Sequence, residues 1–176
     1  MRITCRFGVI LSLAMCASCT ALLAQSNANP LDTVLAYRGT WKAELDHVDA
    51  KTGKSTHESS VIRNLCWKSN EFAACNQVVN GESKILIVYT YNPAGKYYKS
   101  NLILPDGTAA GSGKLIINGS TWIFPWQVEE QGKTVYYRVV NEFTSPAHID
   151  VRQEHSDDNA HWTVTMQGKE EKTGAE

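Results

Sequence analysis

Apolar and polar residues alternate with a period of two along most of the chain, which is the pattern of half-buried β-strands. Residues 133–144 show it clearly, because Tyr137 and Val139 share one side of the predicted strand and Tyr136 and Arg138 share the other. Similar stretches recur throughout the chain. The pattern predicts strands at residues 39–48, 55–67, 72–80, 83–92, 96–104, 108–117, 120–129, 133–144, 147–155 and 160–170.

Short turns separate these stretches. Asn80-Gly81, Asp106-Gly107 and Asn118-Gly119 provide the positive φ angles that tight hairpin turns need. Strands joined this closely run antiparallel, because a parallel crossover needs a dozen or more residues. A meander of this length avoids exposed edges by closing on itself. The predicted fold class is therefore all-β, an antiparallel meander closed as a barrel of about 8 to 10 strands.

A short helix is predicted before the first strand. Pro30 can open it behind an Asn29 cap, with Leu31, Val34 and Leu35 at helical spacing. The expected organisation is a lead with this helix at 25–38, a barrel at 39–172 and a tail at 173–176.

The N-terminus has the layout of a secretory signal peptide, with two arginines, an apolar run at 7–23 and small residues after it. We expect residues 1–24 to be removed and the rest to be periplasmic or secreted. A lipid anchor at Cys16 or Cys19 is the alternative, although neither cysteine follows the residues usual before a lipidated one. No other stretch is long and apolar enough to predict a membrane span.

Removal of Cys5, Cys16 and Cys19 with the signal leaves Cys66 and Cys75. An even cysteine count in an exported chain favours a disulfide. A polar turn between two strand ends would set these two sulfurs opposite each other, which predicts a hairpin disulfide rather than a redox pair.

The charge of the exported chain argues against nucleic acid as a partner. Loss of Arg2 and Arg6 takes the net charge from −1 to −3, and no stripe of basic residues is present. The predicted state is one monomeric domain.

The inner face of the strand at 55–67 is ambiguous. Val61, Leu65 and Trp67 favour the odd-numbered positions as the inner face, which would place Arg63 inside. A polar group inside a barrel needs a partner, water or a ligand. A shift of one residue would instead turn Arg63 outward.

Gly39-Thr40-Trp41, at the start of the first predicted strand after a short helix, resembles the motif of the calycins, the superfamily of lipocalins and fatty-acid-binding proteins. The Cys66-Trp67 hairpin, the tyrosine-rich strands that follow and the closing stretch at 154–169 resemble more narrowly a family of exported bacterial lipocalin-like domains of unknown function. The resemblance covers residues 35–170 and implies structural roles for Gly39 and Trp41, the Trp packing across the closed end of the barrel.

Catalytic, metal and haem sites find little support. His155 and His161 flank the last turn with Asp157 and Asp158, but these are ordinary residues for an exposed turn. His47, on the Trp41 face, is the histidine best placed to ligate haem, although a core histidine is the simpler interpretation. No nucleophile, base and orienting group occur in a recognisable arrangement, so we expect neither an enzyme nor a cofactor.

The leading hypothesis is an exported barrel that binds a small apolar or amphipathic ligand. The alternative is a solidly packed barrel that binds an envelope protein through exposed Tyr98 and Tyr136. The candidate ligand-binding residues are Arg63, Tyr89, Tyr91, Tyr97, Trp122, Trp126, Tyr137 and Asn141.

Overall fold

The computed structural model describes residues 29–49 and 52–175. The predicted signal peptide and the alternative anchor cysteines Cys16 and Cys19 lie outside these ranges. The elements in chain order are the helix α1 (Leu31–Val34), the 3₁₀ helix η1 (Leu35–Tyr37) and the strands β1 (Gly39–Val48), β2 (Ser55–Lys68), β3 (Ala73–Val79), β4 (Glu82–Asn92), β5 (Tyr97–Ile103), β6 (Ala109–Asn118), β7 (Thr121–Glu130), β8 (Lys133–Ser145), β9 (His148–Ser156) and β10 (Thr163–Gly174).

The strands form a closed antiparallel barrel in which each strand pairs with the next and β10 pairs with β1. This confirms the predicted fold class, a calycin-like barrel preceded by a short helix. The last strand ends at Gly174, slightly beyond the predicted boundary of the barrel. Among the residues described, no helix is long and apolar enough to cross a bilayer.

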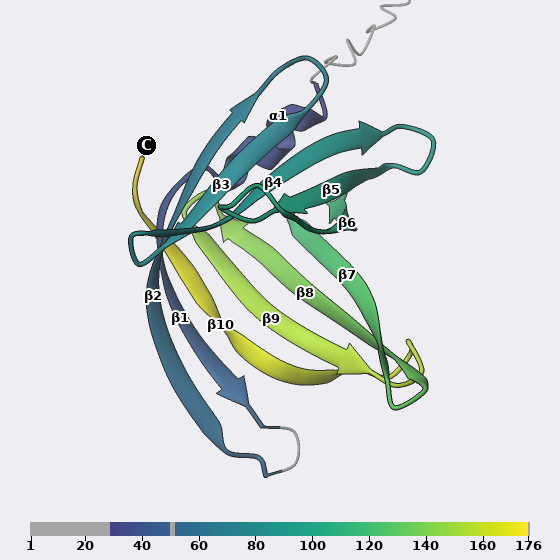
Figure 1. Ribbon diagram of the computed structural model, residues 1–176. Coiled ribbons are helices and arrows are strands. Elements are labelled where there is room, and N and C mark those ends of the chain that lie inside the picture. Colours follow the sequence, from purple (N-terminus) through teal and green to yellow (C-terminus); the bar gives the residue numbers. More distant parts are fainter. Residues whose placement is uncertain (1–28, 50–51, 176) are drawn as a thin grey trace, which may run out of the picture.

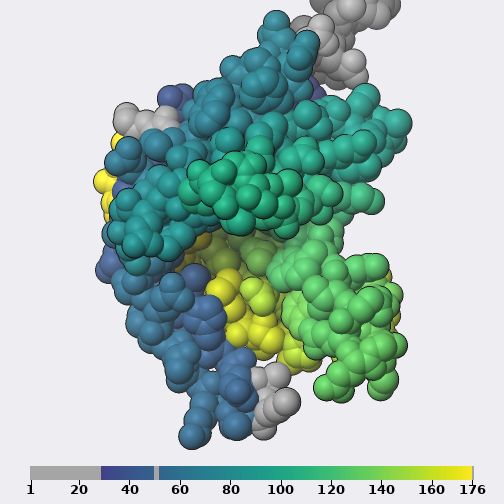
Figure 2. All heavy atoms as spheres, in the orientation of Figure 1, coloured from purple at the N-terminus to yellow at the C-terminus, as the bar shows by residue number. Residues whose placement is uncertain are grey.

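The barrel is uneven along its length. In Figure 1 the strands β1, β2 and β7 to β10 extend downward, past the layer formed by β3 to β6. Figure 2 shows the surface hollowed below that layer, with the inner side of the C-terminal strands visible in the opening. The interior is therefore accessible from this side.

The helical lead, residues 30–37, packs into the opposite end. Leu31 and Val34 are buried in one apolar cluster with Tyr98 and Leu115. The helix begins after Pro30, which takes the N-cap position predicted for Asn29, and Asn29 Oδ1 accepts a hydrogen bond from the Leu31 backbone N–H at 3.0 Å. The Tyr98 hydroxyl donates to the backbone carbonyl of Pro30 at 2.6 Å and ties the lead to β5.

Trp41 is fully buried in a second cluster, with Ala43, Ile62, Ile149 and Val151, which we call the Trp41 core. Gly39, at the start of β1, precedes this Trp by two residues, and its backbone geometry explains why a glycine occupies the position.

Gly39 has a φ of 122°. A Cβ there would lie 2.8 Å from the carbonyl oxygen of Gly174, so a larger residue would push β1 and β10 apart.

Cys66 and Cys75 are directly opposite in the β2–β3 hairpin and form the predicted disulfide, with Cα atoms 4.1 Å apart. The bond joins two inner-face positions, since both cysteines belong to the apolar cluster beneath the helical lead.

The register of β2 reverses the predicted faces. Ile62, Asn64 and Cys66 are buried on the inner face, whereas Arg63 and Trp67 are exposed on the outer one. The prediction was wrong because the outer positions of β2 carry more apolar residues than the inner ones do.

The same one-residue error affects β5. Tyr98 is buried opposite Leu115 of β6, so it is not an exposed aromatic. Tyr97 faces outward and lies under the ammonium group of Lys114, 4.8 Å from its ring centre. Tyr97 is therefore outside the barrel wall that it was predicted to line.

Candidate functional site

A partly enclosed cavity of about 280 Å³ lies inside the barrel, beside the helical lead. Most of its exposed lining is apolar. The residues that line it are Val34, Tyr37, Asn64, Cys75, Gln77, Ile87, Tyr89, Trp122, Phe124, Val139 and Asn141.

Aromatic side chains from two strands form much of the wall. Trp122 and Phe124 are alternate residues of β7, so both point inward. Tyr89 projects from β4 opposite Ala73, whose small side chain leaves room for it. The Trp122 ring is held by Phe143 at 4.9 Å, measured between ring centres. The wall is thus fixed by packing outside the cavity.

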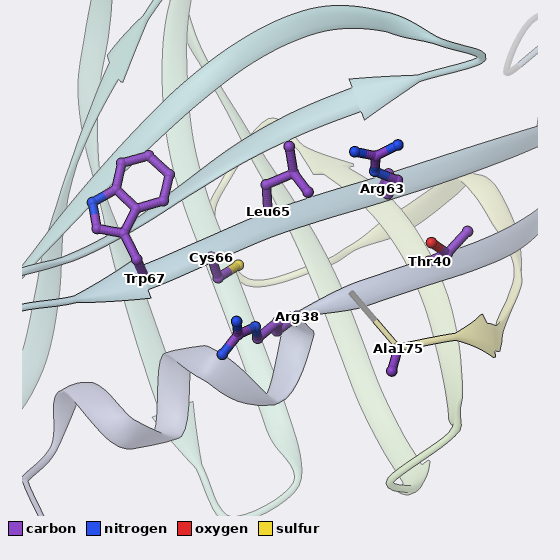
Figure 3. Close-up of a pocket in the computed structure, with 7 residues that line it drawn as sticks. All are labelled: Arg38, Thr40, Arg63, Leu65, Cys66, Trp67 and Ala175. Atoms are coloured by element: carbon purple, nitrogen blue, oxygen red, sulfur yellow. The ribbon is translucent and has the colours of Figure 1, made fainter.

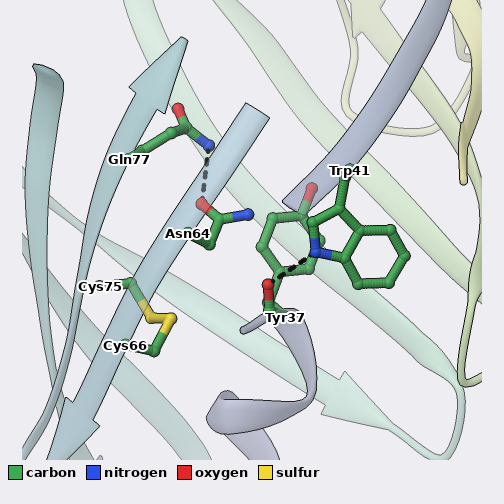
Figure 4. Close-up of a disulfide and its surroundings, with 6 residues drawn as sticks. All are labelled: Tyr37, Trp41, Asn64, Cys66, Cys75 and Gln77. Atoms are coloured by element: carbon green, nitrogen blue, oxygen red, sulfur yellow. Dashed lines mark hydrogen bonds between the residues drawn. A yellow bond between two sulfur atoms is a disulfide. The ribbon is translucent and has the colours of Figure 1, made fainter. Parts of the chain in front are cut away.

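Asn64 places a polar group in this apolar wall. Its side chain is 1% exposed, and Gln77 Nε2 donates to its Oδ1 at 3.5 Å. Its Nδ2 is buried and has no hydrogen-bond partner among the described residues. In Figure 4 this nitrogen points away from Gln77 and toward the ring of Tyr37, which offers at most a weak acceptor.

Asn141 lies in β8 opposite Trp122 and is 4% exposed. Its Oδ1 is the other buried side-chain atom without a partner in the part of the chain that the structure describes. Asn64 and Asn141 thus each bring to the cavity lining one buried amide atom, a donor and an acceptor respectively, that has no partner among the described residues. Each is costly to bury alone.

A buried carboxyl lies behind the cavity. The Tyr37 hydroxyl donates to Glu170 Oε2 at 2.7 Å. Desolvation raises the pKa of Glu170, although the Tyr37 hydroxyl opposes the shift, and burial together with Glu170 raises the pKa of Tyr37 well above its usual value. Neither residue was predicted, because Glu170 is next to Glu171 and two adjacent acidic residues at a strand end give no signal of burial.

Three predicted ligand-binding residues line the cavity, namely Tyr89, Trp122 and Asn141. Tyr91 instead packs on Tyr98, 5.0 Å between ring centres, beneath the helical lead. The ligand-binding roles themselves stay predictions.

Trp126 and Tyr137 lie on the inner face but nearer the open side. Their rings stack 5.4 Å apart, and Tyr137 is 6.2 Å from the His155 ring. Trp126 is 41% exposed. These rings extend the apolar inner wall beyond the cavity rather than lining it.

Arg63 lies outside, in a surface groove formed with Arg38, Thr40, Leu65 and Trp67 (Figure 3). It cannot serve as the polar anchor of the interior that its predicted position suggested.

Two histidines each form a pair with one carboxylate, and His57 lies between Glu44 and Asp46 on the outer surface. His47 Nε2 is 3.0 Å from Glu58 Oε2, and His161 Nδ1 is 2.6 Å from Asp158 Oδ2. Within residues 29–49 and 52–175 no three histidine, cysteine or acidic side chains are grouped to hold a metal ion.

No protein-family model matches the chain, and no curated protein matches its sequence. The fold and the cavity therefore define the class on their own: a calycin-like β-barrel with a small, aromatic-lined interior space.

Proposed function

We propose that this protein is an exported barrel that binds one small, largely apolar ligand in its interior, and that it belongs with the lipocalin-like domains that its sequence resembles. The observation that carries the proposal is the cavity of about 280 Å³ walled by Tyr89, Trp122 and Phe124. Small-molecule sites are typically concave, mostly apolar and supplied with a few polar groups.

The unfilled space and the polar groups in its lining favour ligand binding over a purely structural role for the interior. A barrel interior of this size can be filled by side chains alone. Here a space is left beside Asn64 and Asn141, each of which has one buried amide atom without a partner in the described part of the chain. Export is supported by the N-terminal sequence and by the Cys66–Cys75 disulfide, because disulfides persist in oxidising compartments.

The test is native mass spectrometry of the mature protein purified from its own envelope, compared with the same sample after denaturation. We expect an excess mass that disappears on denaturation. The matched control is Val139→Phe, which places a larger side chain in the cavity wall and should lose the excess mass while still folding. Equal masses for all samples, together with no binding of added apolar probes, would refute the proposal.

A second function is favoured by the outer face of β2. Trp67 and Val61 are 48% and 49% exposed, and Leu65 lies between them on the same face. Such a surface supports an envelope protein-interaction module, through these residues rather than through the buried Tyr98.

Cross-linking in intact envelopes tests the second function. A partner lost in Trp67→Ser but kept in Trp126→Ser, which alters an exposed Trp of the inner face, would support it. A cross-linking pattern unchanged by Trp67→Ser would exclude this face.

A further inference from the structure

We infer that the ligand is a compact, uncharged, flat molecule that has both a hydrogen-bond acceptor and a donor, as a lactam or a carboxamide has. The inference rests on the proposed ligand-binding function and specifies the chemical class. The acceptor would meet Asn64 Nδ2 and the donor would meet Asn141 Oδ1, the two buried atoms that lack partners in the described chain.

The assignment of donor and acceptor follows from what the other end of each amide does. Asn64 Oδ1 accepts from Gln77, which leaves its N–H group for the cavity. Asn141 Nδ2 is not one of the unpartnered buried atoms of the described chain, and the hydrogen bond from Asn141 to the Tyr37 oxygen opposes the rise in the pKa of Tyr37, as a donor does. That contact uses the Asn141 N–H group and leaves its carbonyl oxygen for the cavity.

The absence of charge follows from the lining. Among the described residues that line the cavity there is no lysine, arginine or histidine. A bound carboxylate would be buried without a counter-charge and near Glu170, which lies behind Tyr37. A neutral ligand avoids this cost.

The size and shape follow from the volume and the walls. A cavity of about 150 Å³ holds benzene, and drug-sized ligands occupy about 300 to 1,000 Å³. The present cavity, at about 280 Å³, therefore suits a molecule of about two fused rings. Aromatic faces of Tyr89 and Trp122 favour a flat one.

Four bicyclic probes of nearly equal size separate the two contacts. Indane offers neither group, 2-indanone only an acceptor, indole only a donor, and oxindole both. Isothermal titration calorimetry of the mature protein should show oxindole binding at least about tenfold tighter than indane, with the other two between them. Indane-2-carboxylate should bind more weakly than indane.

Two variants then assign each contact to its residue. In Asn64→Leu, 2-indanone should lose its advantage over indane, while indole keeps its own. In Asn141→Leu, indole should lose its advantage over indane, while 2-indanone keeps its own. Asn101→Leu, on the exposed outer side of β5, should leave all ratios unchanged. Retained binding of indane shows that each variant still has its cavity.

The outcomes distinguish the inference from the function on which it rests. Equal binding of oxindole and indane, abolished in Val139→Phe, would overturn the inference and leave a carrier of apolar molecules, whose amides are served by buried water. Ratios unchanged in both asparagine variants would overturn it as well. Failure of every probe to bind would overturn both proposals.

Discussion

The Trp41 core and the cavity share one barrel interior, yet they treat polar groups in opposite ways. Trp41 is fully buried, and its Nε1 donates to the backbone carbonyl of Tyr37 at 2.9 Å. In the cavity, Asn64 and Asn141 each keep one buried atom without a partner in the described chain. The first region is built for stability, and the second gives up stability at a place where a ligand can restore it.

A substitution at Trp41 should have the largest effect on stability and so tests the contrast between the two regions most strongly. Trp41→Ala should lower the free energy of unfolding by about 3 to 5 kcal/mol, because a large cavity replaces a ring packed against Tyr37 and Phe143. Urea denaturation measures the change. Trp67→Ala, at a Trp that is 48% exposed, should cost no more than about 1 kcal/mol. Equal losses would show that Trp41 has no special structural role.

Glu170 lies between the Trp41 core and the cavity. Its substitution should have an intermediate effect on stability, and that effect should depend on pH. Its raised pKa means that the folded state holds the proton at a pH where the unfolded state has lost it. The contribution of the protonated Glu170 to the free energy of unfolding is fully present below about pH 4.5, the ordinary pKa of a glutamate. It is lost as the pH rises through the pKa of the folded state.

Glu170→Gln keeps a neutral acceptor for Tyr37 at every pH. The difference in melting temperature, variant minus wild type, should therefore be larger at pH 7 than at pH 4. Differential scanning calorimetry measures both melting temperatures. Glu171→Gln, at the exposed neighbour, is the matched control and should show no such trend. A difference for Glu170→Gln that does not vary with pH would contradict the assignment.

Arg63→Ala should have the smallest effect. The side chain lies in the outer groove, so its removal should change stability by no more than about 0.5 kcal/mol and leave probe binding unchanged. Asn64→Leu, one residue further along β2, alters probe selectivity. If Arg63→Ala weakened probe binding as strongly, ligands would bind in the outer groove and not inside.

The fold was predictable because its signals are local, namely alternation, turn residues and a cysteine pair across a hairpin. The faces of β2 were not predicted, because Val61, Leu65 and Trp67 make its outer side the more apolar one. A usable signal was present in the first hairpin. Symmetric pairing about the turn places Trp41 opposite Ile62, as the structure has it, and so places Asn64 inside.

The same reasoning applies to β5. In the structure the turn takes residues 93–96, so Tyr91 pairs with Tyr98 and Tyr97 faces outward. The predicted strand bounds, 83–92 and 96–104, make this turn one residue too short and set Tyr97 opposite Tyr91 instead. The Asn64–Gln77 pair follows from the register that sets Cys66 opposite Cys75. The unused amide atoms were beyond prediction, because they also depend on where the Tyr37 side chain of the helical lead enters the barrel. No pattern along the chain reports such distances.

The seam between β1 and β10 joins the two ends of the folded chain, where Thr40 pairs with Gly174. Until the last strand has been synthesised, β1 and β9 keep open edges that can pair with other chains. Closure of the barrel is thus a long-range event that needs β10, the last strand along the chain. A nonsense mutation before residue 163 would leave an open sheet rather than a slightly smaller barrel.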